Sequence, residues 1–122
     1  MSRFRLSRSA QGDLTHILDI SAERWGSDAR QRYDALLFDA FEQLAAEPAG
    51  PLTRDRTELR TGIRSFHLRH VRRDARGERV RQPVHVIFYR ARPAGVIEVV
   101  RILHERMDPR RHLDPTDEPM EE

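Results

Sequence analysis

Four residues in the second half of the chain have side chains that could act on a phosphodiester bond. Arg64, Arg90 and Arg101 could offer positive charge to a pentavalent phosphate, and His104 could protonate a leaving oxygen. RNA cleavage also needs a base, and Glu98 is the nearest candidate. Strand parity places Glu98 on the face of His104, but roughly 20 Å away along an extended strand, too far for one site. We expect no carboxylate opposite these cations on adjacent strands. Because the chain also has no lysine and no cysteine, it is predicted not to be an enzyme.

The arginines also have explanations that involve no catalysis. All 22 basic residues are arginine, and five of the 20 acids fall in residues 114–122, which leaves 22 arginines against 15 acids, or +7, over residues 1–113. Arg64, Arg90 and Arg101 are therefore read either as solvated or ion-paired strand positions or as a basic patch for a target or an acidic protein partner. His104, as the last residue of a strand, is more often a packing histidine than an acid.

Six histidines raise the question of a metal site. His67 and His70 differ in strand parity, so they should point to opposite faces of a strand. His104, Asp108 and His112 have four-residue spacing, but Pro109 interrupts the helix that would align them. Without cysteine or a paired ligand motif, we expect no metal and no cofactor.

The elements that position these residues begin with a strand and a helix. Residues 3–7 alternate polar and apolar side chains, which predicts a strand with Phe4 and Leu6 on one face. Helical spacing follows, capped by Ser7 or Ser9 and ended by Gly26. The predicted buried stripe is Ala10, Leu14, Ile17, Leu18, Ser21 and Trp25.

A second helix should follow at once and form an antiparallel hairpin with the first. Ser27 or Asp28 is the expected cap, and Pro48 should stop the helix near Ala46. The predicted buried stripe is Ala29, Tyr33, Leu36, Leu37, Ala40 and Leu44.

The rest of the chain has the composition of a loop and three strands. Residues 48–62 lack periodicity and are predicted to be a loop, and Asp108-Pro109 should start one helical turn. Runs rich in β-branched and aromatic residues predict a three-stranded antiparallel meander of Ile63–Arg72, Val84–Arg90 and Val96–His104, with turns at residues 74–78 and 91–95. The predicted fold class is α+β: an N-terminal strand, a helix hairpin and a meander.

Two further predictions concern the limits of the domain and the compartment. Residues 1–113 should form one domain, followed by an acidic, disordered segment, 114–122. No stretch approaches the roughly 20 apolar residues of a membrane span, and residues 1–5 lack the apolar core of a secretory signal. We therefore expect a cytoplasmic protein with no membrane contact.

Seven short sequence motifs, in the order in which they occur along the chain, resemble the RelE/ParE superfamily of bacterial type II toxins, and its ParE branch in particular. They span residues 4–113 and are Leu6-Ser7-Arg8-Ser9-Ala10 with Asp13-Leu14 and Ile17, Arg24-Trp25-Gly26, Leu44-Ala45-Ala46-Glu47-Pro48, Gly62-Ile63-Arg64, His85-Val86-Ile87-Phe88-Tyr89-Arg90, Val99-Val100-Arg101-Ile102-Leu103-His104, and Arg106-Met107-Asp108.

The resemblance implies a RelE/ParE-like fold and a toxin that inhibits DNA gyrase by binding. It also implies a cognate ParD-like antitoxin that neutralises the toxin, with nucleic acid contacted only indirectly, through the antitoxin complex. The alternative, from the RelE branch, is a ribosome-dependent mRNA interferase that would use Arg64, Arg90, Arg101 and His104. A third possibility is an antitoxin-bound co-repressor that has lost its toxicity.

Three apolar residues of the predicted hairpin do not fit its buried stripes. Ile20 and Phe38 lie off the stripes and Phe41 lies at the border of one. Exposed apolar residues on adjacent helices suit a groove for an amphipathic antitoxin helix. Ile20, Phe38 and Phe41 are thus expected to border antitoxin contacts; residual apolar exposure on a monomer is the alternative.

Overall fold

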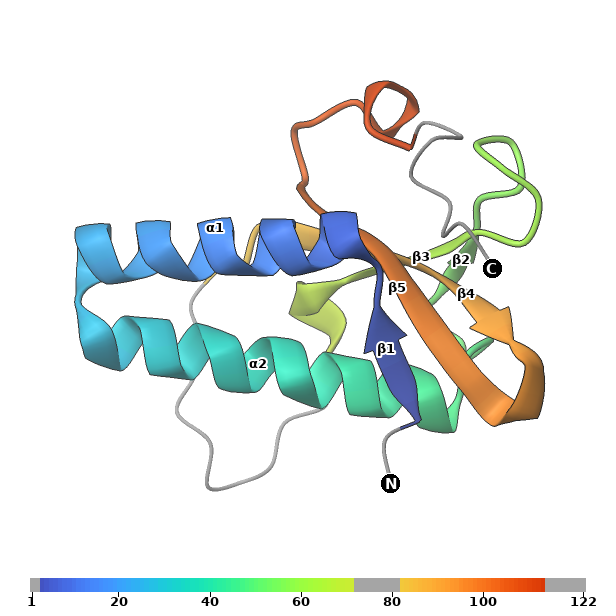
Figure 1. Cartoon of the computed structure of the whole chain (residues 1–122), viewed down its shortest axis with the longest axis horizontal. Coiled ribbons are helices and arrows are strands. Elements are labelled where there is room, and N and C mark those ends of the chain that lie inside the picture. The colour runs from blue at the N-terminus through green and yellow to red at the C-terminus, as the bar shows by residue number, and fades with distance from the viewer. Residues whose placement is uncertain (1–2, 72–81, 114–122) are drawn as a thin grey trace.

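The N-terminal segment folds as a short strand that leads directly into a helix, as the sequence predicts (Figure 1). The computed structural model describes residues 3–71 and 82–113. Strand β1 is Phe4–Leu6 and helix α1 is Arg8–Trp25. Of the two candidate caps, Ser7 is the one used: its Oγ accepts a hydrogen bond from Ala10 N (3.0 Å) and donates one to the carbonyl oxygen of Val100 (2.8 Å). One serine therefore starts the helix and ties it to the sheet.

A single glycine separates α1 from α2, Ser27–Ala46. Gly26 has φ +94°, a conformation that side chains disfavour, and its N–H bonds the carbonyl of Ala22. It also occupies the N-cap position of α2, which has no side-chain cap. The expected cap at Ser27 or Asp28 is thus wrong, because the chain turns within one residue and Ser27 is already helical. The predicted end of α2 at Ala46 is confirmed.

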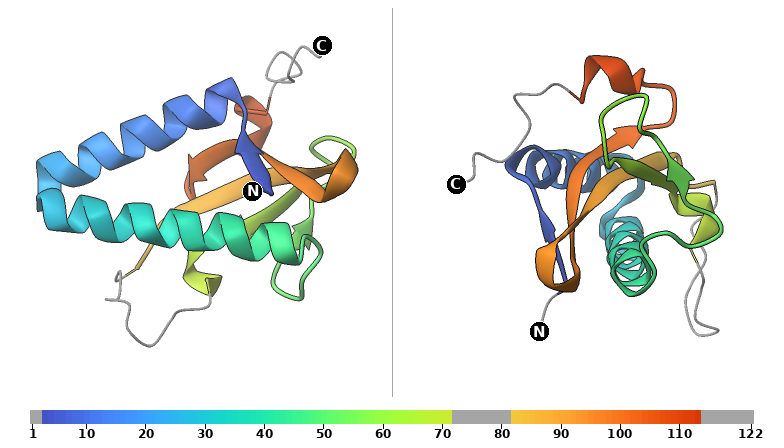
Figure 2. Two further views of the ribbon diagram at one scale, coloured as in Figure 1. Left: turned by 60° about the horizontal axis from the view of Figure 1, so that its bottom comes forward. Right: turned by 90° about the vertical axis from the view of Figure 1, so that its right-hand side faces the viewer.

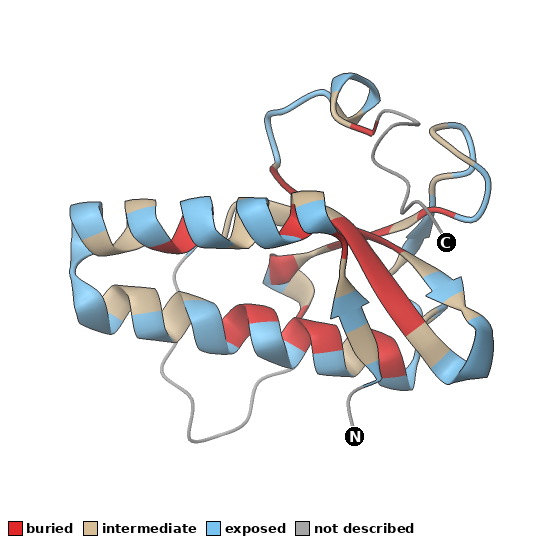
Figure 3. Cartoon of the chain, viewed as in Figure 1, coloured by how far each residue is buried: buried red, intermediate tan, exposed pale blue. Residues whose placement is uncertain are grey.

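The helix hairpin extends beyond the sheet, and this decides which of its residues are buried (Figure 3). Trp25, predicted on the buried stripe of α1, is 73% exposed because it lies at the hairpin tip. The end of α2 near the sheet buries Leu36, Leu37, Ala40, Phe41, Leu44 and Ala45.

The sheet has five strands in the order β1-β5-β4-β3-β2. The predicted meander is confirmed as β3 (Arg64–His67), β4 (His85–Arg92) and β5 (Val96–His104). Two strands extend it: β1 pairs parallel with β5, and the two-residue β2, Arg54–Asp55, pairs antiparallel with β3.

Two segments differ from the sequence prediction, and two others lie outside the residues that the structure describes. β2 lies inside residues 48–62, which were expected to be all loop. The first strand run ends at His67 and continues as a 3-10 turn, Leu68–His70, rather than reaching Arg72. The expected turn at 74–78 and the acidic segment 114–122 lie outside the described residues.

Each face of the sheet carries an apolar cluster, which suits a central strand such as β4. α1 and α2 cover one face, which we call the helix face, and the left view of Figure 2 shows α2 running across the sheet. Ile87, Tyr89, Ile97, Val99 and Ile102 join the helices in this core. On the opposite face, the outer face, Phe88 and Val100 pack in a smaller cluster whose other members are Ile63, Leu103 and Leu113.

The predicted terminal turn closes the outer cluster. Asp108 Oδ1 accepts a hydrogen bond from Arg110 N (3.0 Å) and starts the 3-10 turn Pro109–Arg111. Proline at the first position suits such a start. The turn brings Leu113, 5% exposed, onto the outer face.

Candidate functional site

Arg101, a predicted basic contact, is held by a carboxylate from α1. Its Nε and Nη2 donate to Asp13 Oδ2 (2.8 Å) and Oδ1 (2.9 Å), and its Nη1 donates to the carbonyl of His112 (2.8 Å). Asp13 Oδ2 also accepts from Ile102 N (2.9 Å). The two side chains are only 18% and 15% exposed. Arg101 thus links α1, β5 and the terminal turn, in agreement with the ion-paired alternative.

Arg90 is paired with Glu98 on the adjacent strand. Its Nε lies 3.0 Å from Glu98 Oε1, and the Glu98 side chain is 2% exposed. The expectation that no carboxylate on an adjacent strand would face these arginines is therefore wrong for Arg90, whereas the carboxylate that holds Arg101 comes from the helix α1. Buried charges in proteins are stable only when they are paired in this way.

A β-bulge explains why Glu98 and His104 cannot share a site. Phe88 pairs with Arg101 and Tyr89 with Val99, which leaves Val100 as an extra residue on β5. The extra residue reverses the alternation of side chains. Glu98 therefore faces outward with Arg90, whereas His104 pairs with His85 on the helix face. The predicted common face of Glu98 and His104 is wrong, and the conclusion that they form no single site stands.

Arg64 lies on the helix face, near the end of α2. It pairs in register with Tyr89, and its Nη2 donates to Thr53 Oγ1 (2.8 Å). The Tyr89 hydroxyl donates to the carbonyl of Pro48, and burial raises the pKa of Tyr89. Arg64 Nε is buried and has no hydrogen-bond partner among the described residues. Because Arg90 and Arg101 are on the outer face, the three arginines do not form one patch.

His104 belongs to a polar group that the sequence did not reveal. Its ring meets that of His85 edge-on at 5.6 Å between centroids, and His85 Nδ1 lies 2.7 Å from the hydroxyl of Tyr33 on α2. The same hydroxyl accepts a hydrogen bond from Val84 N (3.3 Å). Burial, with a smaller effect of His104, lowers the pKa of His85 to about 4, and burial raises the pKa of Tyr33 to about 12. Both groups are neutral at pH 7.

A second histidine pair lies near this group. His67 Nε2 is 2.7 Å from Glu105 Oε1, and this hydrogen bond lowers the pKa of Glu105. His67 and His70, expected on opposite faces of a strand, lie with ring centroids 6.4 Å apart because the chain leaves the strand at His67. The hairpin register alone, which pairs Arg92 with Val96, would set His85 opposite Leu103, and only the bulge at Val100 brings His104 opposite His85. No local signal in the sequence therefore indicates this group.

The predicted groove residues differ in their environments. Phe38 is 51% exposed, and Ile20 is half-buried. Phe41 is 3% exposed and belongs to the core, so its place in an exposed groove is wrong: the helix turns it toward the sheet. Phe4 of β1 contacts both phenylalanines, Phe38 edge-on at 5.5 Å and Phe41 at 5.2 Å between centroids. Phe38 is thus the exposed end of a row of three aromatic rings.

Residues 3–71 and 82–113 lack the features of two other classes of site. No group of three or more His, Asp or Glu side chains in these ranges is arranged to hold a metal ion. None of the helices there has both the length and the apolar character needed to cross a membrane.

Comparison with known proteins identifies the family. Residues 4–109 match the family described as the ParE toxin of the type II toxin-antitoxin system, parDE. The chain is 37% identical to Toxin ParE1 of Mycobacterium tuberculosis strain H37Rv over 112 residues, covering 92% of this chain and 98% of the relative. It is 35% identical to Toxin ParE1 of Caulobacter vibrioides, with 93% and 99% covered, and 32% identical to Toxin ParE of Escherichia coli, with 88% and 89% covered.

The chain belongs to the ParE toxin family, so the predicted resemblance is confirmed. It is the toxin component of a type II toxin–antitoxin system, and the family implies a cognate antitoxin as its partner. The helix hairpin packed on a sheet with an N-terminal strand is consistent with the RelE/ParE-like fold.

Proposed function

We propose that the protein inhibits DNA gyrase by binding to it in the cytoplasm, without breaking a bond, and that a ParD-like antitoxin neutralises it. The observation that carries the proposal is the dispersal of the residues a nuclease would need. Arg101 is held by Asp13 and Arg90 by Glu98, both on the outer face, whereas Arg64 and His104 lie on the helix face. Phosphodiester cleavage needs cations and a proton donor around one phosphate.

The polar group around His104 favours the alternative function, that of an mRNA interferase. Tyr33, His85 and His104 are in contact, and His67 and Glu105 form a second pair. Such groups can move protons. None of their side chains is hydrogen-bonded to a guanidinium within the described part of the chain, and the buried neutral His85 lacks the positive charge that would stabilise a phosphate. The binding mechanism therefore remains the better supported one.

A paired assay separates the two functions. Purified toxin should block the supercoiling of relaxed plasmid by gyrase and should leave message on translating ribosomes intact. The matched control is the His104→Ala toxin, which should inhibit gyrase equally well. Cleaved message with unaffected supercoiling would favour the interferase. Normal growth after induction of the toxin alone, at full yield, would favour a co-repressor that has lost its toxicity.

A further inference from the structure

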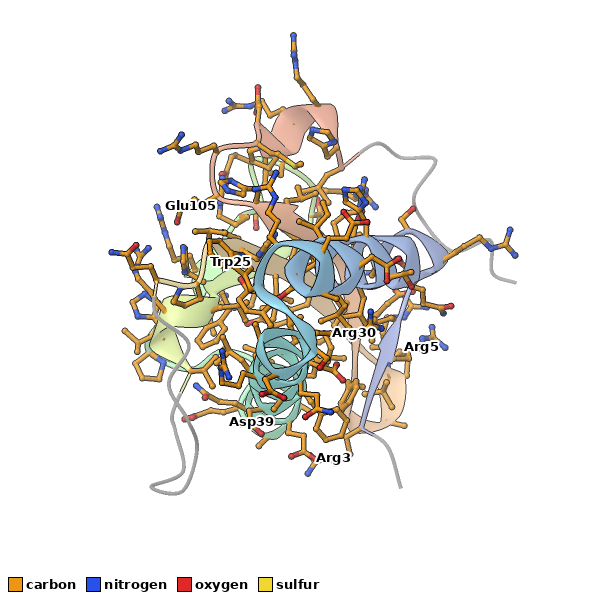
Figure 4. All side chains as sticks on the ribbon, turned by 90° about the vertical axis from the view of Figure 1, so that its left-hand side faces the viewer. Arg3, Arg5, Trp25, Arg30, Asp39 and Glu105 are labelled. Carbon is orange, nitrogen blue, oxygen red and sulfur yellow. The ribbon has the colours of Figure 1, made fainter. Side chains whose placement is uncertain are left out.

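Three arginines gather on the outer face of the sheet at the β4–β5 hairpin. Arg5 of β1 and Arg90 of β4 lie on either side of Glu98 in β5, because both pair with it in register. Residues paired across neighbouring strands share a face, and Arg92, two residues after Arg90, shares it too. Figure 4 shows Arg5 on the side of β1 away from α2. We call Arg5, Arg90, Arg92 and Glu98 the outer arginine cluster.

The cluster has more positive charge than its own residues neutralise. Glu98 is buried and committed to Arg90 at 3.0 Å. Among residues 3–71 and 82–113, no side chain forms an ion pair or a hydrogen bond with the guanidinium of Arg5, which is exposed. Arg92 Nε is buried and has no hydrogen-bond partner in the same ranges. Within residues 3–71 and 82–113 the Arg92 guanidinium therefore has no internal carboxylate partner, and its remaining nitrogen atoms are the ones that could bind an added acceptor.

Other arginines of the chain have the carboxylate partner that Arg5 and Arg92 lack within residues 3–71 and 82–113. Arg101, Arg30 and Arg56 each have a carboxylate within 3.0 Å. A guanidinium forms its strongest hydrogen bonds with planar, charged acceptors such as carboxylates and phosphates. Arg5 and Arg92 are therefore suited to bind an anion of another molecule.

The geometry favours carboxylates over a nucleic acid backbone. Arg90 and Arg92 are two residues apart on one strand, about 7 Å, which matches alternate side chains of an extended peptide. The carboxylate of Glu98 lies between Arg5 and Arg90 and would repel a backbone that carries charge at every unit, whereas a peptide can place an apolar or neutral side chain there. The family also implies a protein partner, the antitoxin.

We propose that the outer arginine cluster docks an acidic, extended segment of the antitoxin. The proposal rests on the proposed neutralisation by an antitoxin and deepens it, since it assigns the contact to Arg5 and Arg92 and leaves Arg64 and Arg101 to their internal partners. Guanidinium–carboxylate pairs at such an exposed surface weaken with salt, so the contact should be sensitive to ionic strength.

The test uses the full chain and defined probes. The acidic probe is an extended hexapeptide of alternating Glu and Val, capped at both ends, and its control is the peptide with Gln in place of Glu. Affinity is measured at low salt by titration, with the arginine Nε–Hε resonances followed by NMR. The test variant is Arg5→Gln with Arg92→Gln, and the matched control is Arg24→Gln, an exposed arginine in the last turn of α1. Circular dichroism verifies that each variant is folded.

The Glu peptide should shift the Arg5 and Arg92 resonances, and the double variant should bind it at least tenfold more weakly, while Arg24→Gln binds normally. Equal affinity for the double variant, or for the Gln peptide, would overturn the proposal. So would tighter binding of a twelve-residue oligothymidylate, which would assign the surface to a phosphodiester.

The acidic residues of 114–122 in the same chain are a competing ligand for the outer arginine cluster, and a separate experiment tests them. Replacing Asp114, Asp117, Glu118, Glu121 and Glu122 by their amides should leave the Arg5 and Arg92 resonances of the free protein unchanged. A shift would assign the cluster to residues 114–122 and overturn docking of a partner. Because these assays contain no gyrase, their outcome is read independently of the proposed target.

Discussion

Replacing Asp13 by asparagine should destabilise the toxin far more than the loss of an ordinary surface charge. The carboxylate accepts two hydrogen bonds from Arg101 and one from Ile102 N, and the two side chains are 15% and 18% exposed. Asparagine keeps the shape but removes the charge and turns an NH₂ group toward guanidinium donors. Arg101 would then be a mostly buried cation that has lost the carboxylate of Asp13.

The magnitude follows from this burial. Breaking a buried ion pair from one side costs about 3–5 kcal/mol, and the slight exposure of this pair suggests the lower end, about 3 kcal/mol. With roughly 0.26 kcal/mol/K of unfolding entropy for 122 residues, the melting temperature should fall by about 12 °C. The assay is thermal and urea unfolding followed by circular dichroism.

Asp19→Asn is the matched control, because Asp19 and its partner Arg30 on α2 are 58% and 42% exposed. It should cost less than about 0.5 kcal/mol, or about 2 °C. If Asp13→Asn were no more destabilising than Asp19→Asn, the conclusion that Arg101 is a structural cation would be refuted, and Arg101 would return as a candidate contact for a target.

Two further predictions concern the aromatic row and the buried histidine. Phe41→Ala should lower the free energy of unfolding, measured in urea, by about 3–4 kcal/mol. Phe38→Ala, at the exposed end of the same row, should lower it by less than about 1 kcal/mol and should weaken antitoxin binding in titration calorimetry. Equal losses of stability in the two variants would contradict the burial of Phe41 and the exposure of Phe38. Since the folded pKa of His85 is about 4 against an ordinary 6.5, the unfolded chain binds its proton more readily, so stability is lost as pH falls from about 6.5 toward 4. Between pH 7 and pH 5 the difference in pKa should lower the free energy of unfolding by about 1 kcal/mol, after a discount for the partial exposure of the ring. His85→Asn should lack this part of the pH dependence. An unchanged pH profile of stability in that variant would contradict the role given to His85.

The sequence predicted those parts of the fold that depend on local signals. Alternation gives β1, helical spacing gives α1 and α2, and Pro48 ends α2 where expected. The two-residue strand β2 was missed because it exists only through its pairing with β3. The exposure of Trp25 was missed because amphipathic spacing does not tell how far a helix extends beyond the sheet.

The site depends on contacts between distant residues, which is why less of it was predictable. Asp13 and Arg101 are 88 residues apart in sequence, and nothing local to either indicates the other. The bulge at Val100 reverses parity, so simple alternation placed Glu98 and His104 on one face when they lie on opposite faces. The sequence indicated which side chains carry charge, but the partner of each is decided by the register of the strands and by the packing of α1 against β5.

The proposed inhibition of gyrase by binding is tested most directly by its stoichiometry. Toxin is titrated against a fixed amount of gyrase and the supercoiled product is measured over time. An inhibitor that acts by complementary contact should reach full inhibition near equimolar toxin and gyrase, stay constant with incubation time, and reverse on dilution. Inhibition that grows with time when the toxin is at a small fraction of the gyrase concentration, or no inhibition at all, would contradict inhibition by binding.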